Sequence, residues 1–252
     1  MKWLVSLVAV LAVGLFSVAL AGPYSSLGYS NETVVIEPEG RPGRLEVANH
    51  DGTFEDAFCW QGAGCVGSTP PYYGCFAEAF DLTYGEVNGI SIWLTRGGDD
   101  SFSSDLDILV WDGGVLSSPE DASVIEVFPG AIPTNVPMWD TVGRNDFPVT
   151  TFTIHDPFSV GYYSDFAGTN CDWFLAVDRD GAGGGHPWTN VLPDLEDLPD
   201  GWVTPDQVWG APVASFGIAI DFTDLSDAPF DDDYDHGSDE SSTWAQVKAL
   251  YR

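Results

Sequence analysis

Short runs of alternating apolar and polar residues recur along most of the chain, with turn-forming residues between them. The clearest run, 105–112, places Leu106, Ile108 and Val110 on one side of an extended segment, and a Gly-Gly pair follows it. Such alternation is typical of a strand with one buried face. The same pattern predicts further strands at 32–37, 44–48, 53–60, 74–82, 87–95, 123–128, 149–154, 158–163, 171–178 and 214–222.

No helix-length segment separates these strands, which excludes a parallel α/β fold. We therefore expect an all-β domain over residues 22–225, built as an antiparallel β-sandwich with a jelly-roll-like arrangement. Two segments break the rhythm of strands and turns. Residues 179–213 are rich in Gly, Pro and Trp and predict a long loop, whereas residues 226–240 predict an acidic linker whose charges repel one another.

The two ends of the chain carry different signals. Residues 1–21 combine one lysine, an apolar stretch and a small-x-small end, which are the three parts of a secretory signal peptide. No later stretch is long and apolar enough to cross a bilayer, so we expect bacterial-type export to the cell surface or the medium. Residues 241–252 predict a short amphipathic α-helix, which docks either on the sandwich or on a secretion or anchoring partner.

The charge of the chain narrows the range of partners. Once residues 1–21 are removed, 39 acidic side chains oppose 7 basic ones, a net charge of −32. Nucleic acid is excluded as a partner, because phosphate binding requires clustered Lys and Arg. The acidity fits either solubility in a salty medium or carboxylates that bind a hard cation such as Ca²⁺.

Clustered aspartates provide the candidate metal ligands. Asp178 and Asp180 belong to a D-x-D-G turn at the end of a predicted strand, where carboxylates and backbone carbonyls supply the oxygens that Ca²⁺ prefers. The turn is not an EF-hand, because Thr189 stands where the final acid is required. Solvent-facing turn residues are the alternative for every candidate. The other candidate ligands are Asp99, Asp100, Asp105 and Asp107.

Four cysteines in an exported chain indicate two disulfide bridges. Zinc binding is disfavoured, because the chain has no C-x-x-C pair. Three of the four fall within one short stretch, so at least one bridge involves that cluster, and the pairing stays open. The residues are Cys59, Cys65, Cys75 and Cys171.

Aromatic side chains in predicted loops suggest a carbohydrate-binding surface centred on residues 179–213. Sugars stack on flat aromatic rings, although rings of this kind also fold inward and pin the loops that carry them. Both interpretations stay open at this point. The residues are Tyr72, Tyr73, Trp188, Trp202 and Trp209.

No residue is assigned a catalytic role. The chain has no H-E-x-x-H, G-x-S-x-G or P-loop sequence. The adjacent pairs His50-Asp51 and His155-Asp156 do not form natural dyads, because neighbouring strand residues face opposite sides. We therefore expect no enzyme activity, and a carboxylate-dependent glycoside hydrolase is kept as an alternative.

The stretch Asp105-Leu-Asp-Ile-Leu-Val-Trp-Asp112 resembles the D-x-D-hydrophobic strand of secreted bacterial β-sandwich modules of the pre-peptidase C-terminal type. The layout of the chain also resembles exported bacterial β-sandwich proteins of uncharacterised function, through residues 51–55, 70–74, 180–185 and 243–252. This resemblance implies a secreted or surface accessory protein.

These observations predict a non-catalytic binding or structural module at the cell surface, with loops stabilised by Ca²⁺. The expected partners are a glycan or a cell-surface protein. Three alternatives remain: a carbohydrate-binding domain, a secreted hydrolase, and a self-associating envelope subunit in which the terminal helix or an edge strand pairs with a neighbour.

Overall fold

The computed structural model describes residues 24–30, 33–36, 45–60, 69–98, 105–115, 117–119, 123–163, 173–181, 184–195 and 197–226. Among these residues, strands predominate and the only helix is α1 (Asp206–Trp209). The prediction of an all-β fold is confirmed. Within the described ranges, no helix has the length and apolar character that a membrane span requires.

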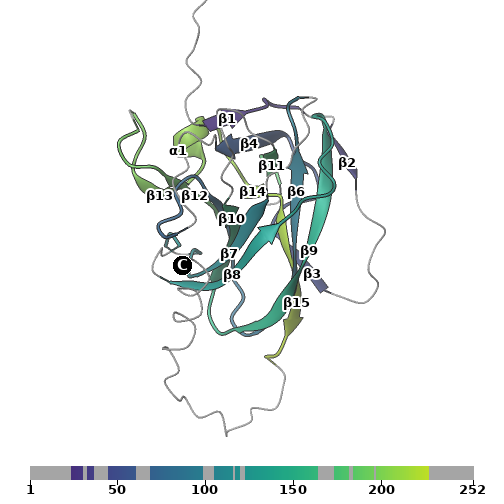
Figure 1. The fold of residues 1–252 in the computed structure, drawn as a ribbon, viewed down its shortest axis with the longest axis vertical. Helices are drawn as coiled ribbons and strands as arrows, with labels where there is room; N and C mark the ends of the chain where they lie inside the picture. The colour runs from purple at the N-terminus through teal and green to yellow at the C-terminus, as the bar shows by residue number, and fades with distance from the viewer. Residues whose placement is uncertain are drawn as a thin grey trace, which may run out of the picture.

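The larger of two sheets holds nine strands among the described residues, with β6 at its centre. One edge of β6 pairs with the long β9, and the other edge pairs first with β15 and then with β11. Figure 1 shows β6 and β9 side by side on the right of the molecule. The strands are β1 (Tyr24–Ser26), β2 (Val34–Ile36), β3 (Leu45–Ala48), β4 (Asp56–Trp60), β6 (Gly85–Thr95), β9 (Thr141–Ile154), β11 (Phe174–Asp178), β14 (Ser215–Phe216) and β15 (Ile218–Asp224).

The smaller sheet holds six strands among the described residues, in the order β13-β12-β5-β10-β7-β8. All of its pairs are antiparallel. Its β12 and β13 lie on the left of the molecule in Figure 1. The strands are β5 (Phe76–Phe80), β7 (Leu106–Asp112), β8 (Val124–Ala131), β10 (Phe158–Tyr163), β12 (Pro187–Val191) and β13 (Gly201–Val203).

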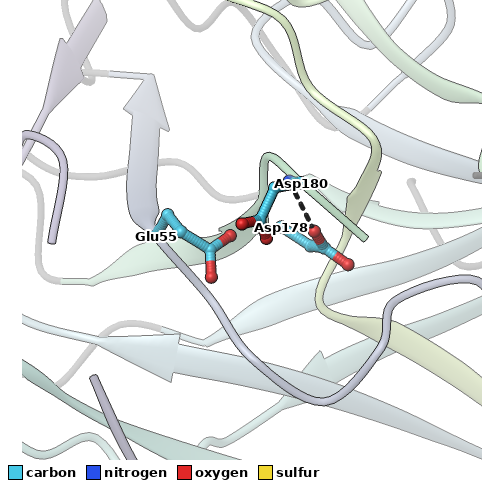
Figure 2. A group of neighbouring side chains, drawn as sticks. All are labelled: Glu55, Asp178 and Asp180. Atoms are coloured by element: carbon cyan, nitrogen blue, oxygen red, sulfur yellow. Dashed lines mark hydrogen bonds between the residues drawn. The ribbon is translucent and has the colours of Figure 1, made fainter. Parts of the chain in front are cut away.

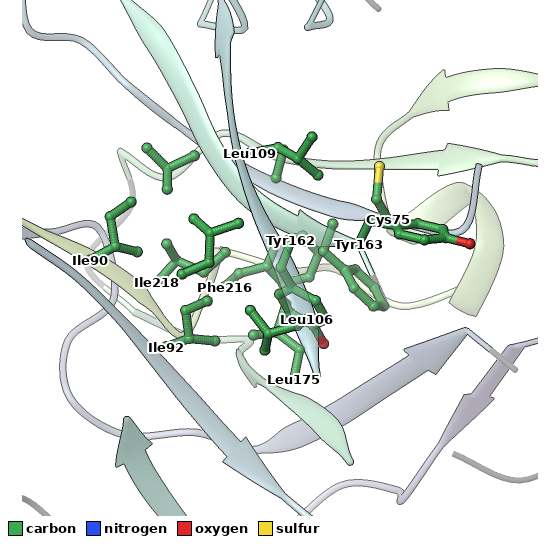
Figure 3. Close-up of a cluster of buried hydrophobic side chains, with 14 of the residues drawn as sticks. Cys75, Ile90, Ile92, Leu106, Leu109, Tyr162, Tyr163, Leu175, Phe216 and Ile218 are labelled. Carbon is green, nitrogen blue, oxygen red and sulfur yellow. The ribbon is translucent and has the colours of Figure 1, made fainter. Parts of the chain in front are cut away.

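Apolar side chains from both sheets form one hydrophobic cluster. Ile90, Ile92 and Ile218 come from the larger sheet, and Leu106 and Tyr162 come from the smaller one, as Figure 3 shows. The residues next to them on each strand point to the opposite face, because successive side chains of a strand alternate. The alternation identifies which residues share a face, and strands such as β5 and β10 are buried on both faces.

The structure corrects two details of the predicted fold. The larger sheet is mixed and not purely antiparallel, because β2 runs parallel to β9. Residues 179–213 are not one long loop: they contain β12, β13 and α1, and β12 pairs with β5 in the smaller sheet. The predicted signal peptide 1–21, the linker from residue 227 to 240 and the helix 241–252 lie outside the described residues.

Candidate functional site

Three acidic side chains meet where β4 begins and β11 ends. Glu55 directly precedes β4, Asp178 is the last residue of β11, and these two strands are antiparallel neighbours. A hydrogen bond of 2.9 Å from the Glu55 N–H to the Val177 carbonyl extends this pairing to Glu55. Carboxylate oxygens of Glu55, Asp178 and Asp180 all lie within 4.8 Å of one another. Figure 2 shows the three carboxylates gathered at this point.

The Asp178 carboxylate ties two loops together. One oxygen accepts a hydrogen bond of 3.0 Å from the Asp51 N–H, which anchors the loop before β4. The other accepts hydrogen bonds from the N–H groups of Asp180 at 3.1 Å and Gly181 at 2.6 Å. A side chain at Gly181 would collide with the Asp178 carboxylate, so it would displace that carboxylate from its present position.

The acidic cluster has little positive charge around it. The Glu55 carboxylate accepts a hydrogen bond of 2.9 Å from the Arg179 backbone N–H, but the Arg179 guanidinium forms an ion pair with Asp56 instead. Among the described residues, no Lys, Arg or His forms an ion pair with Glu55, Asp178 or Asp180. The repulsion between the three carboxylates is therefore uncompensated by a neighbouring cationic side chain.

Burial raises the pKa of Glu55 and the pKa of Asp178 above their ordinary values. Glu55 is 5 % exposed and Asp178 is fully buried. Nearby acids add to both shifts, since Asp180 raises the pKa of Glu55 and Asp51 raises that of Asp178. The charged forms are thus disfavoured, and a bound cation would remove that penalty.

A buried hydroxyl lies on the same side of the sheet as the Asp178 carboxylate. Ser215 is fully buried and pairs directly with Asp178 across β14 and β11. Directly paired residues project their side chains to the same face. The Ser215 hydroxyl has no hydrogen-bond partner in the described part of the chain, which is unusual for a buried polar group.

His50 does not form a dyad with Asp51. Its ring packs against Trp93 at a centroid distance of 4.5 Å and against Phe54 at 5.0 Å. Both ring nitrogens are buried and make no hydrogen bond to any described residue. Burial lowers the pKa of His50 to about 4, so the ring is neutral at neutral pH and gives the acidic cluster no counter-charge.

The other predicted metal ligands do not join this cluster. Asp105 is exposed, and Asp107 accepts a hydrogen bond of 3.0 Å from the Gly130 N–H of β8. Among the described residues, the only acidic group with metal-binding spacing is Glu55, Asp178 and Asp180. Asp99 and Asp100 lie outside the described residues.

The aromatic side chains proposed as a sugar platform pack inward. Tyr72 is 2 % exposed, and Tyr73 is half-buried. Trp202 packs edge-to-face on Trp111, with 5.2 Å between their ring centroids. The remaining two rings are held by indole N–H hydrogen bonds, from Trp188 to the Gly114 carbonyl and from Trp209 to the Ser25 carbonyl. These contacts agree with rings that pack against the protein, and a sugar-binding surface stays a prediction.

A second buried carboxylate, Glu78 of β5, was not singled out from the sequence. One of its oxygens accepts hydrogen bonds from the Asn49 side-chain amide at 2.7 Å and from the His186 N–H at 2.9 Å. The other accepts one of 2.8 Å from the Phe216 N–H of β14. Burial raises the pKa of Glu78 to about 7. Because this carboxyl group is fully buried and joins the two sheets, we assign it a structural role.

Cys59 and Cys75 are both buried, and no disulfide bridge joins these two residues. Cys65 and Cys171 lie outside the described residues, so the two predicted bridges stay a prediction.

Comparison of the chain with family models, with curated proteins and with solved structures gives no match. The resemblance to pre-peptidase-type modules therefore stays a prediction. The site must be interpreted from its own geometry.

Proposed function

We propose that this chain is a secreted or cell-surface, non-catalytic binding or structural module that a bound Ca²⁺ stabilises. The observation that carries this proposal is the cluster of Glu55, Asp178 and Asp180, which brings three carboxylates within 4.8 Å without a paired cation among the described residues. In this proposal the two sheets form a jelly-roll-like sandwich, and the cation fixes the loop that precedes β4 to the turn that follows β11.

The chemistry of the cluster suits a hard cation. Ca²⁺ binds oxygen ligands at about 2.3–2.6 Å and accepts six to eight of them in flexible geometry. Carboxylate oxygens within 4.8 Å of one another can share one such ion. The unpartnered Ser215 hydroxyl is one further oxygen on this side of the sheet, and water and backbone carbonyls would complete the shell.

The hydrogen bonds of the cluster favour a structural role over catalysis. Both Asp178 oxygens accept backbone N–H groups, and one Glu55 oxygen does the same. A general acid or base has to reach a substrate proton. Asp178 and Glu55 are buried and engaged by the backbone, so they support loop fixation better than glycoside hydrolysis.

Calcium is expected to raise the thermal unfolding midpoint by about 5–10 °C at a concentration near a hundred times its Kd. Such a concentration adds about 2.7 kcal/mol to the free energy of unfolding. For a chain of this size each kcal/mol raises the midpoint by about 2–4 °C. Differential scanning calorimetry in EDTA and in millimolar CaCl₂ measures this shift.

The variant Asp180→Asn separates metal binding from folding. Asp180 is exposed, and its removal lowers the repulsion on Glu55. The variant should therefore match or exceed the wild type in EDTA, yet gain much less from Ca²⁺. Asp156→Asn, which removes an exposed acid elsewhere, is the matched control. Equal calcium shifts in wild type and Asp180→Asn, or no shift in the wild type, would contradict the proposal.

The calcium effect should also depend on pH. The pKa values of Glu55 and Asp178 are raised, so protons compete with Ca²⁺ for these carboxylates in acid. The midpoint shift is expected to be larger at pH 8 than at pH 5. A shift of the same size at both pH values would point to binding elsewhere on the acidic surface.

A further inference from the structure

A pocket of about 320 Å³ opens between β8, at the edge of the smaller sheet, and β9 of the larger sheet. Eight of the eleven residues that line it are apolar, among them Ile108, Phe128, Phe147 and Val149, and three are polar, namely Thr134, Asn145 and Asp146. Phe128 also packs against Phe152 of β9, with 5.9 Å between their ring centroids. The pocket therefore gives access to the apolar layer between the two sheets.

Apolar side chains near this pocket are exposed to water. Ile132, which lines the pocket next to the end of β8, is 65 % exposed, and Ile125 of the same strand is 38 % exposed. Exposed apolar side chains at the mouth of a pocket, such as Ile132, are found at contact sites. Covering it would remove apolar area from water and stabilise the covered state.

Asn145, one of the three polar residues that line the pocket, has no spare hydrogen-bonding capacity. The Asn145 side-chain oxygen accepts two backbone N–H groups, from Thr134 and Asn135, each at 2.8 Å. Its side-chain nitrogen donates to the carbonyls of Asn135 and Gly143. A ligand would gain no new hydrogen bond from Asn145, so its apolar neighbours in the pocket wall, such as Phe128 and Phe147, offer the main contact.

We propose that this pocket is the docking site of residues 243–252 of the same chain. This segment, Thr-Trp-Ala-Gln-Val-Lys-Ala-Leu-Tyr-Arg, carries four apolar side chains at helical spacing. Trp244 is the largest of them and is matched in kind to an apolar pocket with aromatic walls.

The tether that precedes this segment has a suitable length. The last residue of β15, Asp224, lies beside Gly85, which in turn pairs with Ile154 at the end of β9. The pocket is lined by residues 147–149 of the same strand, roughly 20 Å away at about 3.3 Å per residue. Residues 227–243 are acidic and rich in Ser and Asp. A flexible chain of that length spans at least about 20 Å, and mutually repelling charges extend it further, so it is long enough to reach the pocket.

The charge of the C-terminal segment is opposite to that of the pocket rim. Lys248 and Arg252 supply two of the 8 Lys and Arg residues in the sequence. Ala131 lines the pocket and pairs with Leu106, which lies between Asp105 and Asp107. The rim near Ala131 is therefore acidic. A basic, apolar segment meets both the apolar pocket and its negative rim.

Trypsin cleavage after Lys248 tests this docking in the full chain. Cleavage releases residues 249–252, which mass spectrometry counts directly. Two variants should each raise the cleavage rate at least about tenfold, because local opening controls access for the protease. Trp244→Ala removes the main apolar anchor, and Ala131→Trp fills the pocket.

Two control variants should leave the rate unchanged. Gln246→Ala changes the tail away from its apolar side, and Leu45→Trp adds a ring at an exposed position on β3. Thermal melts check that each variant is folded. Equal cleavage of wild type, Trp244→Ala and Ala131→Trp overturns the proposal. Protection that falls on dilution also overturns it, since the pocket would then hold the tail of a second copy.

Discussion

As the pH rises from about 5 to about 7, the free energy of unfolding of the wild-type protein is expected to fall by about 3 kcal/mol because Glu78 ionises more readily in the unfolded state. The variant Glu78→Gln is expected not to show this fall. Burial raises the pKa of Glu78 from 4.5 to about 7 in the folded chain. Between these two values the folded state holds a proton that the unfolded state has released. Stability is therefore highest in acid and falls as the pH rises.

Urea unfolding followed by fluorescence at several pH values measures this dependence. The raised pKa values of Glu55 and Asp178 act in the same direction in both proteins, and the charge of Asp178 also raises the pKa of Glu78, so the difference between the proteins includes this coupling. Glu86→Gln, which changes a half-buried acid on the neighbouring sheet, serves as the control and should follow the wild type. Parallel pH profiles for wild type and Glu78→Gln would show that Glu78 is ionised in the folded protein throughout.

Removing the Glu78 carboxyl group altogether should be more severe. In Glu78→Ala the N–H groups of His186 and Phe216 lose their acceptor, and a cavity remains between the sheets. Each buried donor without a partner costs about 1–3 kcal/mol, so we expect a loss of about 4 kcal/mol or more at every pH.

Alanine at Gly161 is expected to lower the free energy of unfolding by at least about 3 kcal/mol. Gly161 lies in β10, where its neighbours Ala77 of β5 and Leu109 of β7 occupy both sides. A methyl group there would overlap the Phe76 carbonyl oxygen and lie 2.7 Å from the Ala77 Cα. These are backbone atoms in the middle of a sheet, so they cannot move aside as a flexible side chain does.

Gly98→Ala provides the matched control, because a methyl group at Gly98 meets no atom within 4 Å. That variant should unfold within about 0.5 kcal/mol of the wild type in the same urea titration. If Gly161→Ala were equally stable, β10 and β5 would have to lie further apart than the structure places them.

Most strands were predictable from alternation alone. The predicted segment 74–82 became β5, 87–95 became most of β6, and 105–112 became β7, each within a few residues. These segments succeed because alternate residues of each strand face the same side, which imposes a two-residue period on the sequence, although β5 is buried on both faces. β9 was only half predicted: residues 149–154 were expected, but the strand begins at Thr141. Its first half contains Asn145 and Asp146, which interrupt the apolar alternation.

Local sequence patterns did not predict the strands within residues 179–213. The Gly, Pro and Trp content of this segment indicates a loop, yet Trp188, Thr189 and Asn190 lie in β12. A proline is compatible with this strand because Pro187 is its first residue, a position where the missing N–H is tolerated. The strand is stabilised by β5, its long-range partner, and no local pattern reports such a partner.

The candidate site was predicted in part. Asp178 and Asp180 were recognised from the D-x-D-G turn, but Glu55, more than a hundred positions earlier, was not. Only the pairing of β4 with β11 brings it to the turn. The position of Glu78 in the sequence does indicate burial, because it stands between Phe76 and Phe80 on the apolar face of its strand. An acid at such a position must be paired or protonated in the core.

The sequence by itself determined the all-β class and the turn at Asp178, because side-chain alternation and turn chemistry are local properties. Tertiary structure alone decided that Glu55 joins that turn, that residues 187–191 form a strand, and that Glu78 spans two sheets. Each of these depends on which distant strands pair and in which register. That choice depends on packing and hydrogen bonding over the whole domain, and no short stretch of sequence contains it.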